Sequence, residues 1–163
     1  MKKLIIINGV PGVGKSAVCS SLYARLDGSV WLDADWCWMM NPFVVTEENK
    51  RMVENNSTYL LRNSLTNSSL KYIVFSWVIH REEIFKLLLD RLKDLSFELH
   101  KISLVCSEKA LKERATKDKR KQEQIEKSLK DMQGYWDMDT IKLDTSELEI
   151  YEVVDKILDI IQG

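Results

Sequence analysis

The glycine-rich stretch GVPGVGKS, residues 9–16, contains the residue types best suited to hold an anion. Gly12 and Gly14 permit backbone angles and close approaches that a side chain would block, so main-chain amide groups can turn toward one ligand. A helix expected to begin near Lys15 adds the positive end of its dipole. Lys15 can reach outer phosphates and the Ser16 hydroxyl can bind Mg²⁺. The stretch predicts a nucleoside triphosphate site formed by Gly9, Pro11, Gly12, Val13, Gly14, Lys15, Ser16 and Ala17.

Two acids, Asp33 and Asp35, follow an expected strand that begins at residue 29. At the carboxyl end of a strand, Asp35 could accept the proton of an acceptor hydroxyl and orient it. Asp33 points the same way as Asp35 if the strand continues, and it could hold Mg²⁺ through water. The alternative is that these carboxylates only cap the following turn.

Six basic residues lie between residues 112 and 121 and include Arg114 and Arg120. Such a run is often a solvated helix face. The alternative, which the family resemblance given below implies, is a segment that closes over a nucleotide, where arginine suits bidentate contact with phosphate better than lysine does. In that case Arg114 is the first candidate and Arg120 the second.

Several other side chains are expected near the ends of strands. Trp36, Trp38 and Trp77 either pack in the core or stack on a planar or apolar acceptor, for which Trp38 is the candidate. Arg81 either holds an anionic group of the acceptor or begins the next helix. His80 is more typical of a helix cap, and His100, inside a strand, has no expected chemical role.

Hydrophobic patterning predicts alternating strands and helices that would position these residues. The expected strands are 2–8, 29–35, 72–79, 97–106 and 140–144. The expected helices are about 15–26, 47–66, 81–95, 107–132 and 145–161, the last with a capping box of Ser146 and Glu149. This order predicts an α/β fold with a five-stranded, mostly parallel sheet, helices on both faces, and a ligand crevice at the carboxyl ends of the strands.

The composition favours one domain spanning residues 1–163. A formal net charge of -1 makes nucleic acid an unexpected partner. No apolar run is long enough for a membrane span, so no membrane partner is expected. The three widely spaced cysteines, Cys19, Cys37 and Cys106, suggest reduced thiols in a cytoplasmic protein. A monomer and a homodimer are both compatible with the sequence.

The chain resembles the P-loop small-molecule and nucleotide kinases of the adenylate, shikimate and gluconate kinase type, and also chloramphenicol phosphotransferase. The resemblance is carried by GVPGVGKS, WLDADWCWMMNPF, IVFSWVIHREEIFKLLLDRL, LKERATKDKRK and IKLDTSELEIYEVVDKI. It implies the P-loop NTPase fold, ATP and Mg²⁺, and an acid at Asp35 facing the acceptor hydroxyl. It further implies a short lid at about residues 112–124 that carries Arg114 and Arg120, and an adenine bordered by residues 144–146.

The sequence departs from the family pattern where the third strand ends. Many relatives have an aspartate there to support the magnesium shell, whereas this chain has Ser76 and Trp77. Asp33 is the nearest substitute as a metal ligand.

The leading hypothesis is a phosphotransferase that moves the γ-phosphoryl group of ATP to a hydroxyl or phosphate group of a small molecule. One alternative is a nucleotide-binding ATPase or switch with no small-molecule acceptor. Another is a kinase acting on polynucleotide 5′ ends, which the nearly neutral charge disfavours.

Overall fold

The computed structural model describes the whole chain, residues 1–163, and shows one five-stranded sheet in the order β2-β3-β1-β4-β5. Every neighbouring pair of strands is parallel, which confirms the predicted α/β fold. The strands are β1 (Lys2–Asn8), β2 (Ser29–Asp33), β3 (Tyr72–Trp77), β4 (Phe97–Val105) and β5 (Ile141–Asp144).

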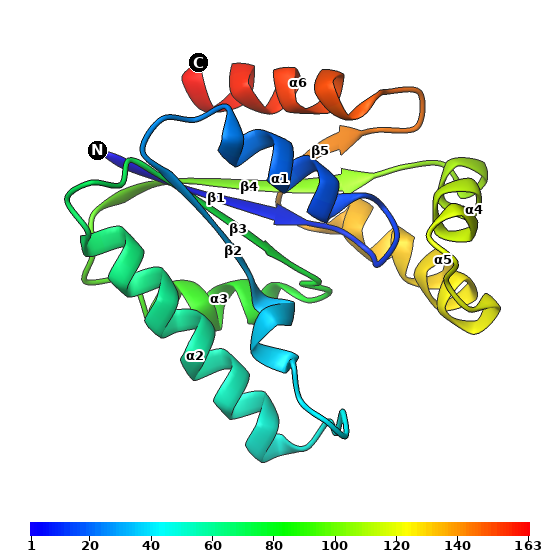
Figure 1. Cartoon of the computed structure of the whole chain (residues 1–163), viewed down its shortest axis with the longest axis horizontal. Coiled ribbons are helices and arrows are strands. Elements are labelled where there is room, and N and C mark those ends of the chain that lie inside the picture. The colour runs from blue at the N-terminus through cyan, green and yellow to red at the C-terminus, as the bar shows by residue number, and fades with distance from the viewer.

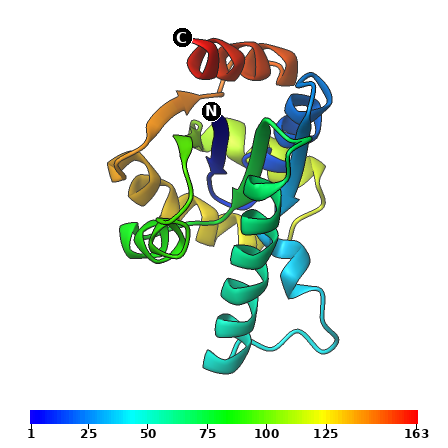
Figure 2. The same cartoon turned by 90° about the vertical axis from the view of Figure 1, so that its left-hand side faces the viewer.

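Helices cover both faces of this sheet (Figure 1). Helices α1 and α6 lie on one face, whereas α2, α3 and α5 lie on the other, as the turned view in Figure 2 also shows. The helices are α1 (Lys15–Ala24), α2 (Glu47–Thr66), α3 (Glu82–Asp90), α4 (Glu108–Lys117), α5 (Gln122–Asp137) and α6 (Ile150–Gln162).

Strand β1 is the centre of the core. Residues 4–7 are fully buried because helices cover both faces of the strand and β3 and β4 flank it. A single cluster of 35 buried residues joins this strand to the helices on each side. The carboxyl end of β1 therefore leads into the glycine-rich loop from a firmly packed position.

Strand β2 is shorter than predicted. It ends at Asp33, and a 3-10 helix, η1 (Ala34–Trp38), follows. The Asp33 carboxylate accepts a hydrogen bond from the Asp35 backbone N–H at 2.8 Å and caps this helix. The expected strand 29–35, on which Asp33 and Asp35 would point the same way, is therefore wrong at its end.

The predicted helix at 107–132 is two helices, α4 and α5, joined at residues 118–121. Lys119 has a φ of 56°, and the Arg120 N–H bonds back to the Ala115 carbonyl at 3.0 Å. A left-handed residue ends the helical hydrogen-bond pattern, so the chain turns before α5 begins. Arg120 consequently lies in a turn and not on a helix face.

The last helix is capped differently from the prediction. Glu149 is the N-cap of α6 and exchanges hydrogen bonds with the third helical residue, Glu152. Ser146 instead accepts a hydrogen bond from the Ser107 N–H and donates one to Asp144. The expected box of Ser146 and Glu149 is wrong because Ser146 joins two loops.

Two other boundaries also differ from the prediction. Strand β3 ends at Trp77, because the buried Asn8 side chain, and not a neighbouring strand, bonds to the backbone of Ile79. The Asn8 side chain accepts from the Ile79 N–H at 2.7 Å and donates to the Ile79 carbonyl at 2.9 Å. Helix α3 ends at Asp90, and a turn occupies the following residues. No helix combines the length and apolar character needed to cross a bilayer.

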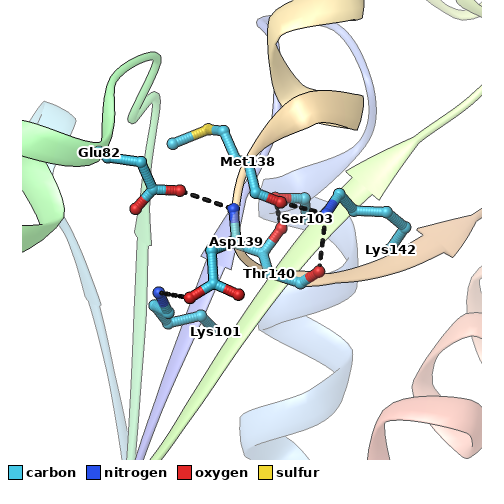
Figure 3. A network of polar contacts seen from close by, with 7 residues as sticks. All are labelled: Glu82, Lys101, Ser103, Met138, Asp139, Thr140 and Lys142. Carbon is cyan, nitrogen blue, oxygen red and sulfur yellow. Dashed lines mark hydrogen bonds and ion pairs between the residues drawn. The ribbon is translucent and has the colours of Figure 1, made fainter.

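A polar network fixes the end of α5 (Figure 3). The Asp139 N–H donates to Glu82 at 2.6 Å, and the Asp139 carboxylate lies 3.4 Å from the Lys101 ammonium. The hydroxyls of Ser103 and Thr140 lie 2.7 Å apart. These contacts tie the junction between α5 and β5 to α3 and β4.

Candidate active site

The glycine-rich loop requires glycine at two positions. Gly12 has a φ of 88° and Gly14 a φ of 106°, which are left-handed values that other residues rarely adopt. A Cβ added to Gly12 would lie 3.3 Å from the Arg120 Nε, whereas one on Gly14 would project into open space. The loop therefore leaves its backbone accessible and lets Arg120 approach closely.

Backbone amide groups of this loop are free to bind a ligand. The N–H groups of Gly12 and of residues 14–17 donate no hydrogen bond within the chain, and no side chain caps α1 at Gly14. By contrast, Thr46 caps α2 and Ser107 caps α4. Free N–H groups at a helix start, together with the helix dipole, form an anion site.

Lys15 lies within this anion site. Its ammonium group donates to the carbonyls of Gly9 at 2.8 Å and Val10 at 3.0 Å. Burial lowers the pKa of Lys15 from 10.5 to about 8, although the negative charges of Asp35 and Asp33 oppose this shift. A phosphate would restore the charge balance that burial disturbs.

Asp35 projects from η1 into the same region. Desolvation by the surrounding walls and then the neighbouring Asp33 raise the pKa of Asp35, whereas Lys15 and Arg120 lower it. Asp33 is only 9% exposed. The four charged side chains therefore act on one another, and Asp35 holds its proton more readily than an ordinary carboxyl group.

A cavity of about 1120 Å³ joins these groups. Its walls come from the glycine-rich loop and the start of α1, the end of β2, η1 and the segment after it, the segment after β3, the turn at residues 118–121, and α5. It brings together the predicted residues Pro11, Gly12, Gly14, Lys15, Ser16, Ala17, Asp33, Asp35, Trp38 and Arg120.

A second cavity of about 610 Å³ lies on the other side of the loop. Arg114 lines it and donates to the Thr145 hydroxyl at 2.7 Å, to the Thr145 carbonyl, and to the Val13 carbonyl at 3.4 Å. Thr145 and Ser146 also line this cavity, where the sequence predicted the border of the adenine site. Gly12 and Gly14 belong to both cavities.

The two arginines therefore occupy different places. Arg114 lines the second cavity, whereas Arg120 lines the large cavity and acts on Asp35 and Lys15. Arg120 is the arginine placed beside the acidic pocket, because the chain turns at residues 118–121 and does not continue as a helix. The predicted order of the two arginines as phosphate contacts stays a prediction.

Of the other side chains considered from the sequence, some line the large cavity and others do not. His80 lines the large cavity, but Arg81 does not and is the exposed N-cap of α3. Trp36 packs on Trp31 with ring centroids 5.2 Å apart, and Trp77 packs on Phe75. Neither of these two predicted indoles lines the large cavity.

Sequence analysis missed two parts of the large cavity. One is the face of α5, where the Ser128 hydroxyl donates to the Pro11 carbonyl at 2.9 Å and Gln124 and Lys127 lie nearby. The other is Met39 with Phe43. The sequence did offer a signal for the α5 face: Ser128 is a small polar residue at helical spacing from Met132, four residues later.

A magnesium ion fits this region only with help from its nucleotide. No group of three or more His, Cys, Asp or Glu side chains is placed to hold a metal. Ser16 and Asp33 both line the large cavity and supply two oxygen-bearing side chains. Magnesium commonly binds with few protein ligands, and phosphate oxygens and water complete its shell.

The parallel sheet, the free amides and the buried lysine define a P-loop nucleotide-binding protein. A family model described as an AAA domain matches residues 5–137, and the chain belongs to this family. No curated protein gave a significant sequence match.

Solved structures share the fold over almost the entire chain. The tunicamycin resistance protein of Deinococcus radiodurans is 20% identical, with a TM-score of 0.76 over 99% of this chain and 96% of that one. A gluconokinase from Sinorhizobium meliloti 1021 is 16% identical, with a TM-score of 0.69 over 97% and 90%. Shikimate kinase from Bacteroides thetaiotaomicron is 14% identical, with a TM-score of 0.62 over 99% of each chain. The chain therefore has the fold of P-loop kinases.

Proposed function

We propose that this protein is an ATP-dependent phosphotransferase that moves the γ-phosphoryl group to a hydroxyl or phosphate group of a small molecule, with Mg²⁺ as cofactor. The observation that carries the proposal is the position of Asp35, which faces the same cavity as Lys15, Arg120 and the free amides of the loop. The kinases with the same fold support it.

The loop amides and the Lys15 ammonium hold the phosphates. Phosphoryl transfer depends mainly on position and on charge compensation, which these groups supply. Ser16 and Asp33 would hold Mg²⁺, which would neutralise part of the charge on the phosphates of ATP. The carbonyls of Gly9 and Val10 hold the Lys15 ammonium beside the loop, so this side chain needs little reorganisation when phosphate binds.

Asp35 orients the acceptor and takes the proton that the acceptor hydroxyl loses. Its raised pKa brings this carboxylate nearer to neutral pH, where a general base works best. Asp33 fixes the Asp35 backbone through the 2.8 Å hydrogen bond, so the two acids have different tasks.

Residues 112–124 act as the lid, with Arg120 as the residue that compensates charge on the migrating phosphoryl group. Arg114 supports the base side of the nucleotide through its contacts with Thr145. Arg81 does not line the cavity, so a contact between Arg81 and the acceptor stays a prediction.

Residues 1–163 act as one domain in the cytoplasm, as a monomer or homodimer, and nucleic acid is not a substrate. One continuous core supports the single domain. Three cysteines without a disulfide suit a reducing compartment. The net charge of -1 supports a small acceptor over a polynucleotide.

The test is ATP turnover with Mg²⁺, measured with and without a pooled metabolite extract. Stimulation by the extract that is lost in Asp35→Ala, while calorimetry shows that ATP still binds, supports the proposal. Turnover that no extract changes, combined with a protein partner captured in only one nucleotide state, would favour a switch and reject the phosphotransferase.

A further inference from the structure

The acceptor side of the large cavity has two walls of unlike chemistry. Helix α5 contributes a polar wall that includes Gln124, Ser128 and Lys130. Trp38, which ends η1, and Phe43 in the segment after it form an apolar wall. A ligand that fills this space must present hydrogen-bonding groups and apolar surface together.

The apolar wall is open to solvent in spite of its composition. Met39 is 84% exposed and Phe43 is 63% exposed. The rings of Trp38 and Phe43 lie 5.5 Å apart at an interplanar angle of 55°, a common geometry for packed aromatic pairs. Apolar surface of this extent is costly in water unless something covers it.

This surface continues beyond the cavity along the chain. Val44 is 43% exposed and Val45 is 54% exposed. The Asn49 side chain donates to the Val44 carbonyl at 2.8 Å and lies 3.7 Å from the Met40 sulfur, which fastens the segment to the first turn of α2. Met52, three residues after Asn49 on the same helix face, is 41% exposed.

These six residues form what we call the apolar strip: Trp38, Met39, Phe43, Val44, Val45 and Met52. The segment that carries most of the strip lies at the far end of α2, away from the sheet (Figure 2). No other part of the fold packs over this end of the molecule. The strip is therefore continuous with the cavity at Trp38 and Phe43 and extends outward from it.

On the acceptor side, α5 contributes two lysines to the cavity lining, Lys127 and Lys130, and no arginine. Arg120 is the one arginine that lines the large cavity, and it lies against Gly12 in the phosphate loop. Lys127 is paired with Asp131 at 2.8 Å. The cavity thus lacks a free arginine, the residue best suited to grip a carboxylate or a second phosphate away from the loop.

We propose that the phosphate acceptor is a hydroxyl compound with an extended apolar or aromatic portion, bound with its hydroxyl at Asp35 and its apolar portion along the strip. This inference rests on the proposed function for the position of the reacting hydroxyl. Continuity between the cavity and the strip makes a single ligand spanning both the simplest occupant.

The test is calorimetric binding of three defined probes: methyl, hexyl and phenyl β-D-glucoside, each without ATP. These probes share one polar group and differ only in apolar size. We expect the hexyl and phenyl compounds to bind at least about tenfold more tightly than the methyl compound, because each covers apolar surface on the strip. In a variant that combines Met39→Ser with Phe43→Ser, this difference should largely disappear.

Tyr151→Ser is the matched control. Tyr151 lies on α6, outside both cavities, and is 62% exposed, almost the same as Phe43. The control should keep the full preference for the hexyl and phenyl compounds. Equal binding of all three probes, or a preference that survives in the double variant, would overturn the inference.

Two further outcomes separate this inference from its rivals. If light scattering shows a dimer that the double variant converts to a monomer, the strip is a self-association surface and the inference fails. If the preference for apolar probes holds while no acceptor of any kind is phosphorylated, the phosphotransferase proposal fails and the strip is still a ligand site.

Discussion

The two ends of the large cavity are built in opposite ways. At the phosphate end, Val10 and Val13 are buried and the ligand-facing groups are backbone amides set by β1 and α1. At the acceptor end, residues 41–48 are all exposed and the ligand-facing groups are side chains. The first end is fixed by the fold itself, whereas the second can change its chemistry by substitution with little cost to the core.

Under the proposed function, this difference would let one fold serve unlike acceptors. The 3-10 helix η1 joins the two ends, because Asp33 at its start packs at the edge of the sheet and Trp38 at its end begins the apolar strip. In the proposed reaction, the rigid side positions the reacting groups and the exposed side selects the acceptor.

The strongest test of the comparison is Asp35→Asn, which removes the carboxylate at the junction and leaves the loop intact. We expect kcat for the stimulated reaction to fall about 10³-fold, because a positioned general base typically contributes 10²- to 10⁴-fold. ATP affinity by calorimetry should stay within about twofold. Asp27→Asn, on the exposed turn before β2, is the control; a comparable loss in that variant would contradict the role given to Asp35.

The next test concerns the phosphate end alone. Lys15→Met should weaken ATP binding about 10²-fold or more, because the buried ammonium group is the main side-chain charge in the anion site. Calorimetry measures this directly. Lys50→Met, which removes an exposed lysine paired with Glu47, should leave the affinity unchanged. Wild-type affinity in Lys15→Met would remove the lysine from the phosphate site.

The two arginines offer a test within the lid. Arg120→Ala should lower kcat about 10²-fold with a small change in KM for ATP, since it removes charge compensation beside Asp35. Arg114→Ala should mainly raise KM for ATP, because it loosens the second cavity at Thr145. Steady-state kinetics of both variants separates the roles, and the opposite split would restore Arg114 as the residue that acts on the phosphoryl group.

A smaller effect follows from the pKa of Lys15, which burial lowers from 10.5 to about 8. The charged form is lost as pH rises through this value, so phosphate binding should weaken by up to about tenfold per pH unit above pH 8. Nucleotide affinity measured from pH 6.5 to 9.5 checks the direction. Calorimetry above pH 8 in two buffers of different ionisation enthalpy should detect proton uptake on binding, and its absence would mean that Lys15 stays charged throughout.

The smallest expected effect concerns the first turn of α2, to which the apolar strip is fastened. Thr46 accepts the Asn49 N–H at 3.1 Å and caps α2, so Thr46→Ala should lower the free energy of unfolding by about 1 kcal/mol. Urea denaturation measures the change. Thr66→Ala, near the other end of α2, removes the same atoms, but its hydroxyl bonds to a carbonyl within its own helix and caps no free N–H, so it should cost less. Equal losses in both would show that the Thr46 cap does not stabilise this end.

Much of the fold was predictable because its signals are local. The aliphatic run at residues 4–7 and the spacing of Gly12, Gly14 and Lys15 each act over a few residues, and the structure confirms the strand, the turn and the helix that they predict. The boundaries that were wrong depend on particular polar contacts. Asp33 ended β2, and Lys119 divided a long charged helix.

The acceptor end was less predictable because distant segments form it. Trp38 was correctly placed in the cavity, but Trp36 and Trp77 found aromatic partners elsewhere. Ser128 faces the loop only because α5 is a separate helix that returns past Pro11. Spacing along the chain does not encode such long-range placement, so it could not show that Arg114 and Arg120 line different cavities.

The free amide groups of residues 14–17 have a practical consequence for anyone who handles this protein. Without an anion, these donors rely on water alone, so pyrophosphate or inorganic phosphate in the buffer should act as a stabilising additive. A ligand at a hundred times its Kd raises the unfolding free energy by about 2.7 kcal/mol. Melting temperatures recorded in phosphate and in a non-coordinating amine buffer would therefore differ, and comparisons between variants have meaning only in a common buffer.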